Sequence, residues 1–223
     1  MNLNTYPDRD MAVIKLAGVL ASALRNCLIQ HEVASLAVPG GTTPGPVFDV
    51  LSAAEIDWSR VHVMLTDERW VPGDHPRSNT ALVKERLLTG PAAAARFFPF
   101  YREGLTAQEA AGVLSEEITP LIPVSVLLLG MGADMHTASL FPDADGVDAA
   151  LSRDAPAVVA MAPDSQPEAR ISLSGPVLAG AMDKHLLIFG DEKHAALDRA
   201  MTLPGPEAPI GMAIRGGEVH WAA

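Results

Sequence analysis

The residues with the clearest catalytic potential are Asp134 and His136, in the stretch GMGADMHTASLFP at 130–142. This stretch follows an apolar run at 124–129, bounded by proline and glycine, which predicts a buried parallel strand. A glycine turn therefore brings both side chains to the carboxyl edge of a sheet, where open α/β folds bind ligands. A histidine beside a carboxylate there can act as a general base near neutral pH. The pattern also fits a loop histidine that caps the next helix.

A second candidate site is the glycine turn GGTTP at 40–44, which follows a short apolar strand at 36–38. Gly40 and Gly41 allow backbone N–H groups to approach an anion closely, and Thr42 adds a hydroxyl donor. The helix that follows contributes a partial positive charge at its N-terminus. The turn is neither a Walker A loop nor a GxGxxG fingerprint, and its alternative interpretation is a plain strand-to-helix connection.

A third strand, in the stretch VHVMLTDERWV at 61–71, ends in three consecutive charged residues, Asp67, Glu68 and Arg69. Charges at the end of a strand usually mark a solvated loop. However, three glycine-rich or charged strand ends along one chain predict a shared cleft, because parallel strands end at the same edge of a sheet.

Together these stretches resemble the 6-phosphogluconolactonase family in order and spacing, from about residue 36 to residue 200. The matching motifs are GGTTP at 40–44, TDERWVP at 66–72, HPRSN at 75–79, LLLGMGADMHTASLFP at 127–142, ARISLS at 169–174 and GDEKHAAL at 190–197. The family usually has glycine where Met135 stands. Either that glycine serves a positive φ, or it leaves space beside the substrate. We favour space, because a flexible Met vacates space more cheaply than it tolerates a forbidden backbone angle.

The resemblance implies a site for 6-phosphoglucono-δ-lactone, with His136 as the general base on water. Asp134 would orient the imidazole or, alternatively, tie down the glycine turn, and Asp67 would orient water or a sugar hydroxyl. Arg170 and Lys193 match basic residues that the family uses for phosphate. Arg69 is a third candidate cation, whose alternative is a local ion pair. Further substrate contacts would come from Gly40, Gly41 and Thr42. His75 and Asn79 are expected to shape a loop, and a serine acyl-enzyme is not expected because Ser139 lacks a GxSxG elbow.

Strand and helix signals alternate along the chain, which predicts an α/β fold with a mostly parallel sheet and helices on both faces. We expect one domain, residues 1–223, and the resemblance implies the Rossmann-like fold shared with glucosamine-6-phosphate deaminase and ribose-5-phosphate isomerase. Expected strands cover 36–38, 61–66, 124–129, 157–160, 171–173 and 185–189, with extended segments at 96–101 and 210–221. Expected helices cover an amphipathic N-terminal segment and residues 46–54, 79–88, 106–118, 176–181 and 192–201, with a short helix from Thr137.

The composition limits the kinds of partner that the protein is expected to bind. A net charge of −11 without a Lys/Arg cluster argues against nucleic acid and anionic membrane surfaces, and requires any phosphate site to be local. Cys27 is the only cysteine, and no HExxH or HxH spacing occurs, so neither a disulfide nor a metal site is expected. We expect no cofactor, no transmembrane helix, a cytoplasmic location, and a monomer or small homo-oligomer.

Two other functions remain open from the sequence. The glycine turn and the histidine loop also resemble glucosamine-6-phosphate deaminases or isomerases, although the Asp-Glu-Arg triplet at 67–69 favours the lactonase. A non-catalytic sugar-phosphate-binding protein is the alternative of a different class, and Met135 makes it more plausible.

Overall fold

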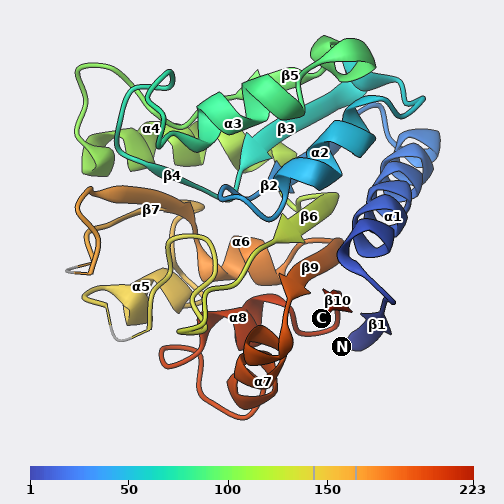
Figure 1. The fold of residues 1–223 in the computed structure, drawn as a ribbon. Coiled ribbons are helices and arrows are strands. Elements are labelled where there is room, and N and C mark those ends of the chain that lie inside the picture. The colour runs from blue at the N-terminus through green and yellow to red at the C-terminus, as the bar shows by residue number, and fades with distance from the viewer. Residues whose placement is uncertain (143, 164) are drawn as a thin grey trace.

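The computed structural model describes residues 1–142, 144–163 and 165–223 as two β-sheets with flanking helices (Figure 1). The strands are β1 (Asn2–Thr5), β2 (Ala34–Val38), β3 (Val61–Leu65), β4 (Asp67–Arg69), β5 (Arg96–Phe98), β6 (Val126–Leu129), β7 (Val158–Met161), β8 (Arg170–Leu173), β9 (Asp183–Phe189) and β10 (Glu218–Ala222). The α-helices are α1 (Arg9–Gln30), α2 (Gly45–Ser52), α3 (Asn79–Arg86), α4 (Ala107–Ile118), α5 (Val147–Leu151), α6 (Gly175–Ala179), α7 (Asp191–Ala200) and α8 (Pro209–Ala213). Short 3-10 helices cover Trp58–Arg60, Gly90–Ala94 and Thr119–Leu121.

The main sheet has seven strands in the order β1-β10-β9-β6-β2-β3-β5, and every neighbouring pair is parallel. Figure 1 shows α1 and α2 on one side of this sheet, and α6 and α8 on the other. The predicted parallel sheet with helices on both faces is therefore confirmed. Its central strands β2 and β6 are buried at every position, which explains why their sequences are continuous apolar runs.

Helix α1 begins where the carboxylate of Asp8 accepts a hydrogen bond from the N–H of Met11, at 2.7 Å. Among the described residues it is the one helix long and apolar enough to cross a membrane by length and composition. Its apolar residues form one buried face against the sheet and α2, which accounts for that composition. The buried residues of this face are Ala12, Val13, Leu16, Ala17, Leu20, Ala21, Leu24 and Leu28.

The second sheet, β4-β8-β7, is antiparallel and was not predicted as a separate unit. Its strand β4 consists of Asp67, Glu68 and Arg69, which the sequence suggested were a strand end or loop. Charged residues form a strand here because their partners are local: Glu68 accepts hydrogen bonds from the Ser78 hydroxyl and from the backbone N–H of Thr80. The antiparallel register places Arg69 opposite Arg170.

Two sequence predictions were wrong in detail. The helix expected from Thr137 is absent from the described residues, because Thr137 and Leu140 form an isolated antiparallel bridge, and the next helix is α5. The tail expected to be extended from Ile210 begins instead with α8, where Pro209 at the first helical position suits a helix start. Only β10 is extended there.

Candidate active site

A cleft of about 340 Å³ lies at the carboxyl edge of the main sheet, where the loops after β2, β3 and β6 meet the second sheet and α7. The shared cleft predicted from three strand ends is thus present. The lining includes these residues, which the sequence suggested as catalytic or substrate-binding: Gly40, Gly41, Thr42, Asp67, Arg69, His136, Arg170 and Lys193.

His136 lines the cleft, and its Nδ1 lies 2.6 Å from Oδ1 of Asp134. The hydrogen bond from His136 lowers the pKa of Asp134, so this carboxyl group is ionised at neutral pH. An ionised Asp134 accepts a hydrogen bond from Nδ1–H of His136, and in this tautomer the lone pair of the ring is on Nε2. The imidazole is therefore held in the tautomer that can take a proton from water.

The backbone around this pair leaves room for the two side chains and adds a hydrogen bond to one of them. A Cβ atom on Gly132 would lie 2.2 Å from Oδ1 of Asp134 and 2.3 Å from Nδ1 of His136, so only glycine leaves room for the pair. The backbone N–H of His136 also donates to Oδ1 of Asp134, at 3.3 Å. Asp134 therefore makes both contacts considered from the sequence, one with the imidazole and one within the turn.

Met135 adopts a φ of 69°, in the left-handed region that favours glycine. Its N–H donates to the carbonyl of Gly132 at 3.0 Å and closes a tight turn. Our expectation that the family's usual glycine serves space beside the substrate is therefore wrong, and Met135 does not line the cleft. The physical reason is the turn itself, which needs a positive φ between Asp134 and His136.

The glycine turn after β2 forms one wall of the cleft, together with the N-terminus of α2. Gly41 has a φ of 87°, and a Cβ on Gly40 would fall 1.8 Å from Oδ1 of Asn79. The side-chain amide of Asn79 donates to the carbonyl of Asp67, at 2.8 Å. As expected, Asn79 holds neighbouring loops together, and it also lines the cleft. His75 lies outside the cleft lining, and its Nδ1 accepts the N–H of Arg77 at 3.1 Å.

Two arginines face each other across β4 and β8 at the other end of the site. Arg170 is buried, with 5% of its surface exposed, and its Nη1 lies 4.0 Å from Oδ2 of Asp67. Its Nη2 donates to Oε1 of Gln166. The Nε atoms of both Arg170 and Arg69 are buried without a hydrogen-bond partner among the described residues. Both arginines line this end of the cleft, where planar guanidinium groups can donate hydrogen bonds to an anion.

The charge around Arg170 supports the same assignment. Burial lowers the pKa of its guanidinium, and so do the nearby Arg69 and Arg77, while the carboxylates of Asp67 and Glu168 raise it. A bound dianion would relieve this excess of positive charge. Lys193, at the third position of α7, completes the set of cations lining the cleft.

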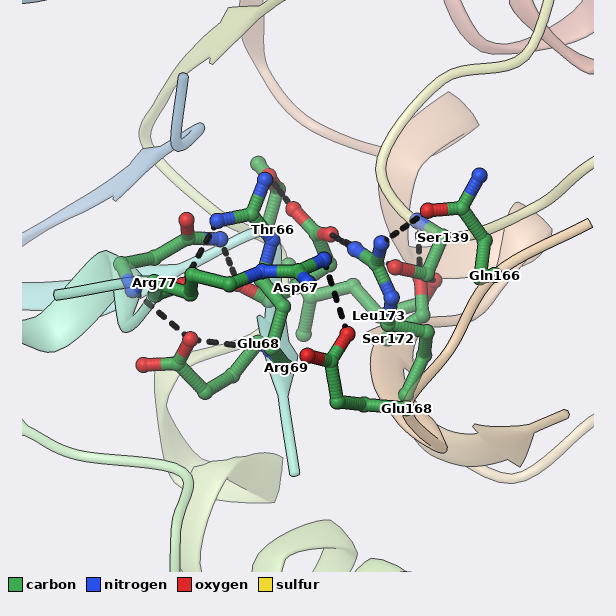
Figure 2. Close-up of polar contacts among 12 residues, drawn as sticks. Thr66, Asp67, Glu68, Arg69, Arg77, Ser139, Gln166, Glu168, Ser172 and Leu173 are labelled. Atoms are coloured by element: carbon green, nitrogen blue, oxygen red, sulfur yellow. Dashed lines mark hydrogen bonds and ion pairs between the residues drawn. The ribbon is translucent and has the colours of Figure 1, made fainter. Parts of the chain in front are cut away.

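Two side-chain hydrogen bonds fix the carboxylate of Asp67 in place (Figure 2). Its Oδ2 accepts the hydroxyl of Ser139 at 2.6 Å, and its Oδ1 accepts that of Thr66 at 3.2 Å. Because only 7% of Asp67 is exposed, these contacts tie the histidine loop to β4. The partner Ser139 was missed as a site residue because it lies 72 positions away in sequence.

Two further cleft residues had no clear signal. Gln166, in the loop before β8, belongs to no periodic pattern. Phe141 stacks on the ring of His136, with centroids 4.4 Å apart, and could have been found only as the aromatic residue that follows the histidine motif.

The fold and the cleft define a Rossmann-like α/β protein with a His–Asp pair and a cluster of cations at the carboxyl edge of its parallel sheet. The model of the family described as glucosamine-6-phosphate isomerases/6-phosphogluconolactonase matches residues 7–221. A 6-phosphogluconolactonase of Mesorhizobium japonicum is 40% identical over 229 aligned positions, covering 99% of this chain and 95% of the relative. One of Pseudomonas aeruginosa is 39% identical, covering 92% and 88%. This chain therefore belongs to the glucosamine-6-phosphate isomerase/6-phosphogluconolactonase family.

Solved structures agree with this assignment. The crystal structure of a 6-phosphogluconolactonase from Shewanella baltica is similar with a TM-score of 0.94 and 33% identity, covering 100% of this chain and 98% of that one. A monomeric glucosamine-6-phosphate deaminase is similar with a TM-score of 0.81 at 16% identity, which shows the shared fold alone. The expected likeness to that deaminase fold is confirmed, while the likeness to ribose-5-phosphate isomerase stays a prediction.

Proposed function

We propose that this protein hydrolyses 6-phospho-D-glucono-1,5-lactone to 6-phosphogluconate, a step of the oxidative pentose phosphate pathway. Relatives named for this activity match the chain at up to 40% identity over nearly its full length. The observation that carries the proposal is one cleft lined by the histidine of a His–Asp pair and by three cations, Arg69, Arg170 and Lys193. The substrate has a matching pair of features, an ester carbonyl and a phosphate.

His136 is the general base in this proposal. Its Nε2 accepts a proton from water as the water oxygen attacks the lactone carbonyl, and Asp134 stabilises the imidazolium that forms. The tetrahedral intermediate then collapses with cleavage of the bond to the ring oxygen, which takes the proton back from His136. The product acid ionises, so each turnover releases one proton. A base of this kind contributes about 10²–10⁴-fold to the rate.

Arg170 and Lys193 bind the phosphate, with Arg69 as an additional cation. The guanidinium groups of Arg170 and Arg69 line the cleft and can donate charge-assisted hydrogen bonds to phosphate oxygens. The protein carries a net charge of −11, so these cations must act locally to hold an anionic substrate. On the opposite wall, Gly40, Gly41 and Thr42 donate to the substrate.

Asp67 acts as a positioning residue in this proposal. It orients a sugar hydroxyl or water from the cleft wall while its two oxygens hold Ser139 and Thr66. Neither a cofactor nor a metal is required, because a lactone is an activated ester and its hydrolysis needs a base, oxyanion stabilisation and a bound phosphate.

We also infer that residues 1–223 act as one 6-phosphogluconolactonase-like domain, since one core cluster runs from α1 to β10. The acidic charge without a basic cluster supports a cytoplasmic enzyme that binds neither nucleic acid nor membrane. The assembly would be a monomer or a small homo-oligomer.

The test is to incubate the purified protein with freshly generated phosphogluconolactone and, separately, with glucosamine 6-phosphate. Proton release above the spontaneous rate, lost in His136→Ala, supports the lactonase. Ammonia release would instead identify a deaminase. Neither product, together with saturable binding of 6-phosphogluconate, would identify a non-catalytic binder.

A further inference from the structure

A second cluster of histidines and carboxylates lies away from the cleft, at the amino-terminal ends of β9 and β10. His185 is on β9 and pairs in register with Glu218, the first residue of β10, while His220 is two positions further along β10. Lys184 points to the other face of the sheet, where its ammonium donates to the carbonyl of Ala179 next to α6. His185 therefore faces the side covered by α1.

The spacing of the ligand atoms suits one metal ion. Nδ1 of His185 lies 3.2 Å from Nε2 of His220, and Oε2 of Glu218 lies 3.9 Å from the same Nε2. All three side chains can place a ligand atom within 4.8 Å of the others. Zinc binds imidazole nitrogen at about 2.0–2.1 Å in tetrahedral geometry, so two such nitrogens lie about 3.4 Å apart.

The outer nitrogen of each ring lies near an oxygen of the kind that supports metal ligands. Nε2 of His185 lies 3.1 Å from Oδ1 of Asp183, and Nδ1 of His220 lies 2.8 Å from the hydroxyl of Tyr6. A metal-bound histidine usually donates its other N–H to a carboxylate or another oxygen, which fixes the ring orientation. Here the contacts turn Nδ1 of His185 and Nε2 of His220 toward each other.

Burial and charge also favour a cation. The two rings are buried, at 1% and 0% exposure. The side chains of Asp183 and Glu218 are 46% and 41% exposed, which leaves an entry path from solvent. Within the described ranges, neither carboxylate forms an ion pair with a lysine or arginine.

We propose that His185, His220 and Glu218 bind a divalent transition-metal ion of the Zn²⁺ type, at a structural site separate from the catalytic cleft. Through the hydrogen bond of His220 to Tyr6, the ion would hold β9, β10 and the segment after β1 together. The same atoms could instead form a metal-free hydrogen-bond chain from Tyr6 through His220 and His185 to Asp183. The 3.2 Å between the two ring nitrogens, close to the spacing of two ligands on one zinc ion, favours the metal.

The experiment is a zinc titration of the EDTA-stripped, full-length protein, with bound zinc measured by elemental analysis after gel filtration and the thermal midpoint Tm recorded. We expect about one Zn²⁺ per chain and a rise in Tm. His185→Gln and Glu218→Gln should each weaken binding at least ~10-fold and suppress the rise in Tm. Glu218→Gln decides the matter if His185→Gln does not fold, because the side chain of Glu218 is partly exposed.

Two controls locate the ion. His194→Gln removes a half-exposed histidine that also has an aspartate neighbour, Asp198 at 3.4 Å, and should leave zinc binding unchanged. His136→Gln disrupts the His–Asp pair of the cleft and should also retain the zinc. No bound zinc in the wild type, or zinc lost in His136→Gln and retained in His185→Gln, would overturn the proposal and leave the hydrogen-bond chain as the role of the cluster.

Discussion

The same short pattern, aspartate and histidine two residues apart, occurs in two regions of this molecule with opposite results. Asp134 and His136 lie 2.6 Å apart at Oδ1 and Nδ1, while Asp183 and His185 lie 3.1 Å apart at Oδ1 and Nε2. Each histidine thus lies beside a carboxylate, and at His136 the two form a hydrogen bond. The first pair lies in a turn at the cleft, and the second begins a central strand of the sheet.

The backbone makes the difference. In the turn, Gly132 leaves room for the pair and Met135 supplies a positive φ, so the side chain of His136 remains 29% exposed. In β9, residues two apart point to the same face, and the side chain of His185 is 1% exposed. A His–Asp pair therefore indicates catalysis only where a turn presents it to a cavity, and the following predictions test that distinction.

The largest effect is expected for His136→Ala, which should lower kcat by at least ~10²-fold with little change in Tm, because a general base is lost from a partly exposed position. Lactonase assays and thermal melts measure the two quantities. His194→Ala is the matched control and should be neutral in both. Turnover like that of the wild type in His136→Ala would place the base elsewhere, with Asp67 the first residue to examine.

Substitutions of the cations that line the cleft should affect the phosphorylated lactone far more than the unphosphorylated one. Each charge-assisted hydrogen bond is worth roughly 1.5–3 kcal/mol, so Arg170→Ala and Lys193→Ala should each reduce kcat/KM for the phosphorylated lactone by about 10–150-fold. The kcat/KM for unphosphorylated gluconolactone should fall far less. The ratio of the two kcat/KM values does not depend on how much of the protein is folded. Equal losses on both substrates would make these residues structural.

The converse of the first prediction concerns the buried pair. His185→Ala should destabilise the protein by about 2–3 kcal/mol, because a buried side chain is lost and the nitrogen of His220 loses its partner. The kcat of the folded fraction should change less than about twofold. Denaturant unfolding in EDTA, with assays on the same samples, measures both. A collapse of kcat at unchanged stability would give the buried pair a catalytic role.

A smaller effect is expected at Met135. Met135→Gly and Met135→Ala both remove the side chain, but only glycine tolerates a φ of 69° without strain. The glycine variant should therefore be more stable than the alanine variant by about 1 kcal/mol, net of the greater unfolded-state entropy of glycine. Equal stabilities in denaturant unfolding would mean that the turn relaxes around either residue.

No effect on kcat is expected from chelation. After prolonged dialysis against EDTA, lactonase activity per folded protein should persist, since His136 and Asp134 supply the base. Tm should fall if a metal was bound near His185. Activity that is lost and then restored by one divalent ion would replace the general base with a metal-bound hydroxide.

The sequence predicted those parts of the fold that follow from local composition. The apolar runs of β2 and β6 are buried on both faces and could be read directly. The charged strand β4 could not, since it exists only because β8 and the N-terminus of α3 satisfy its charges. The helix expected from Thr137 failed for a similar reason, because contacts of the turn outweigh local propensity.

The site likewise combines features that local sequence predicts with features that exist only in the folded chain. Residues of the glycine turn, the charged strand end and the histidine loop line one cleft as expected, because parallel strands end at one edge. Ser139 and its partner Asp67 are 72 positions apart, and their contact exists only in the folded chain. The pairing of His185 with His220 depends on the register of two strands, and no spacing along the sequence encodes it.

The pairing of β1 with β10 has a consequence for the order of assembly. Tyr6, just after β1, contacts His220 across 214 positions of sequence, and Arg9 donates to the backbone carbonyl of Ala223. During synthesis, this edge of the sheet cannot close until β10 has left the ribosome, so β1 docks only after a strand made much later than itself. Until β10 pairs, the outer edge of β9 is open and can pair with another chain.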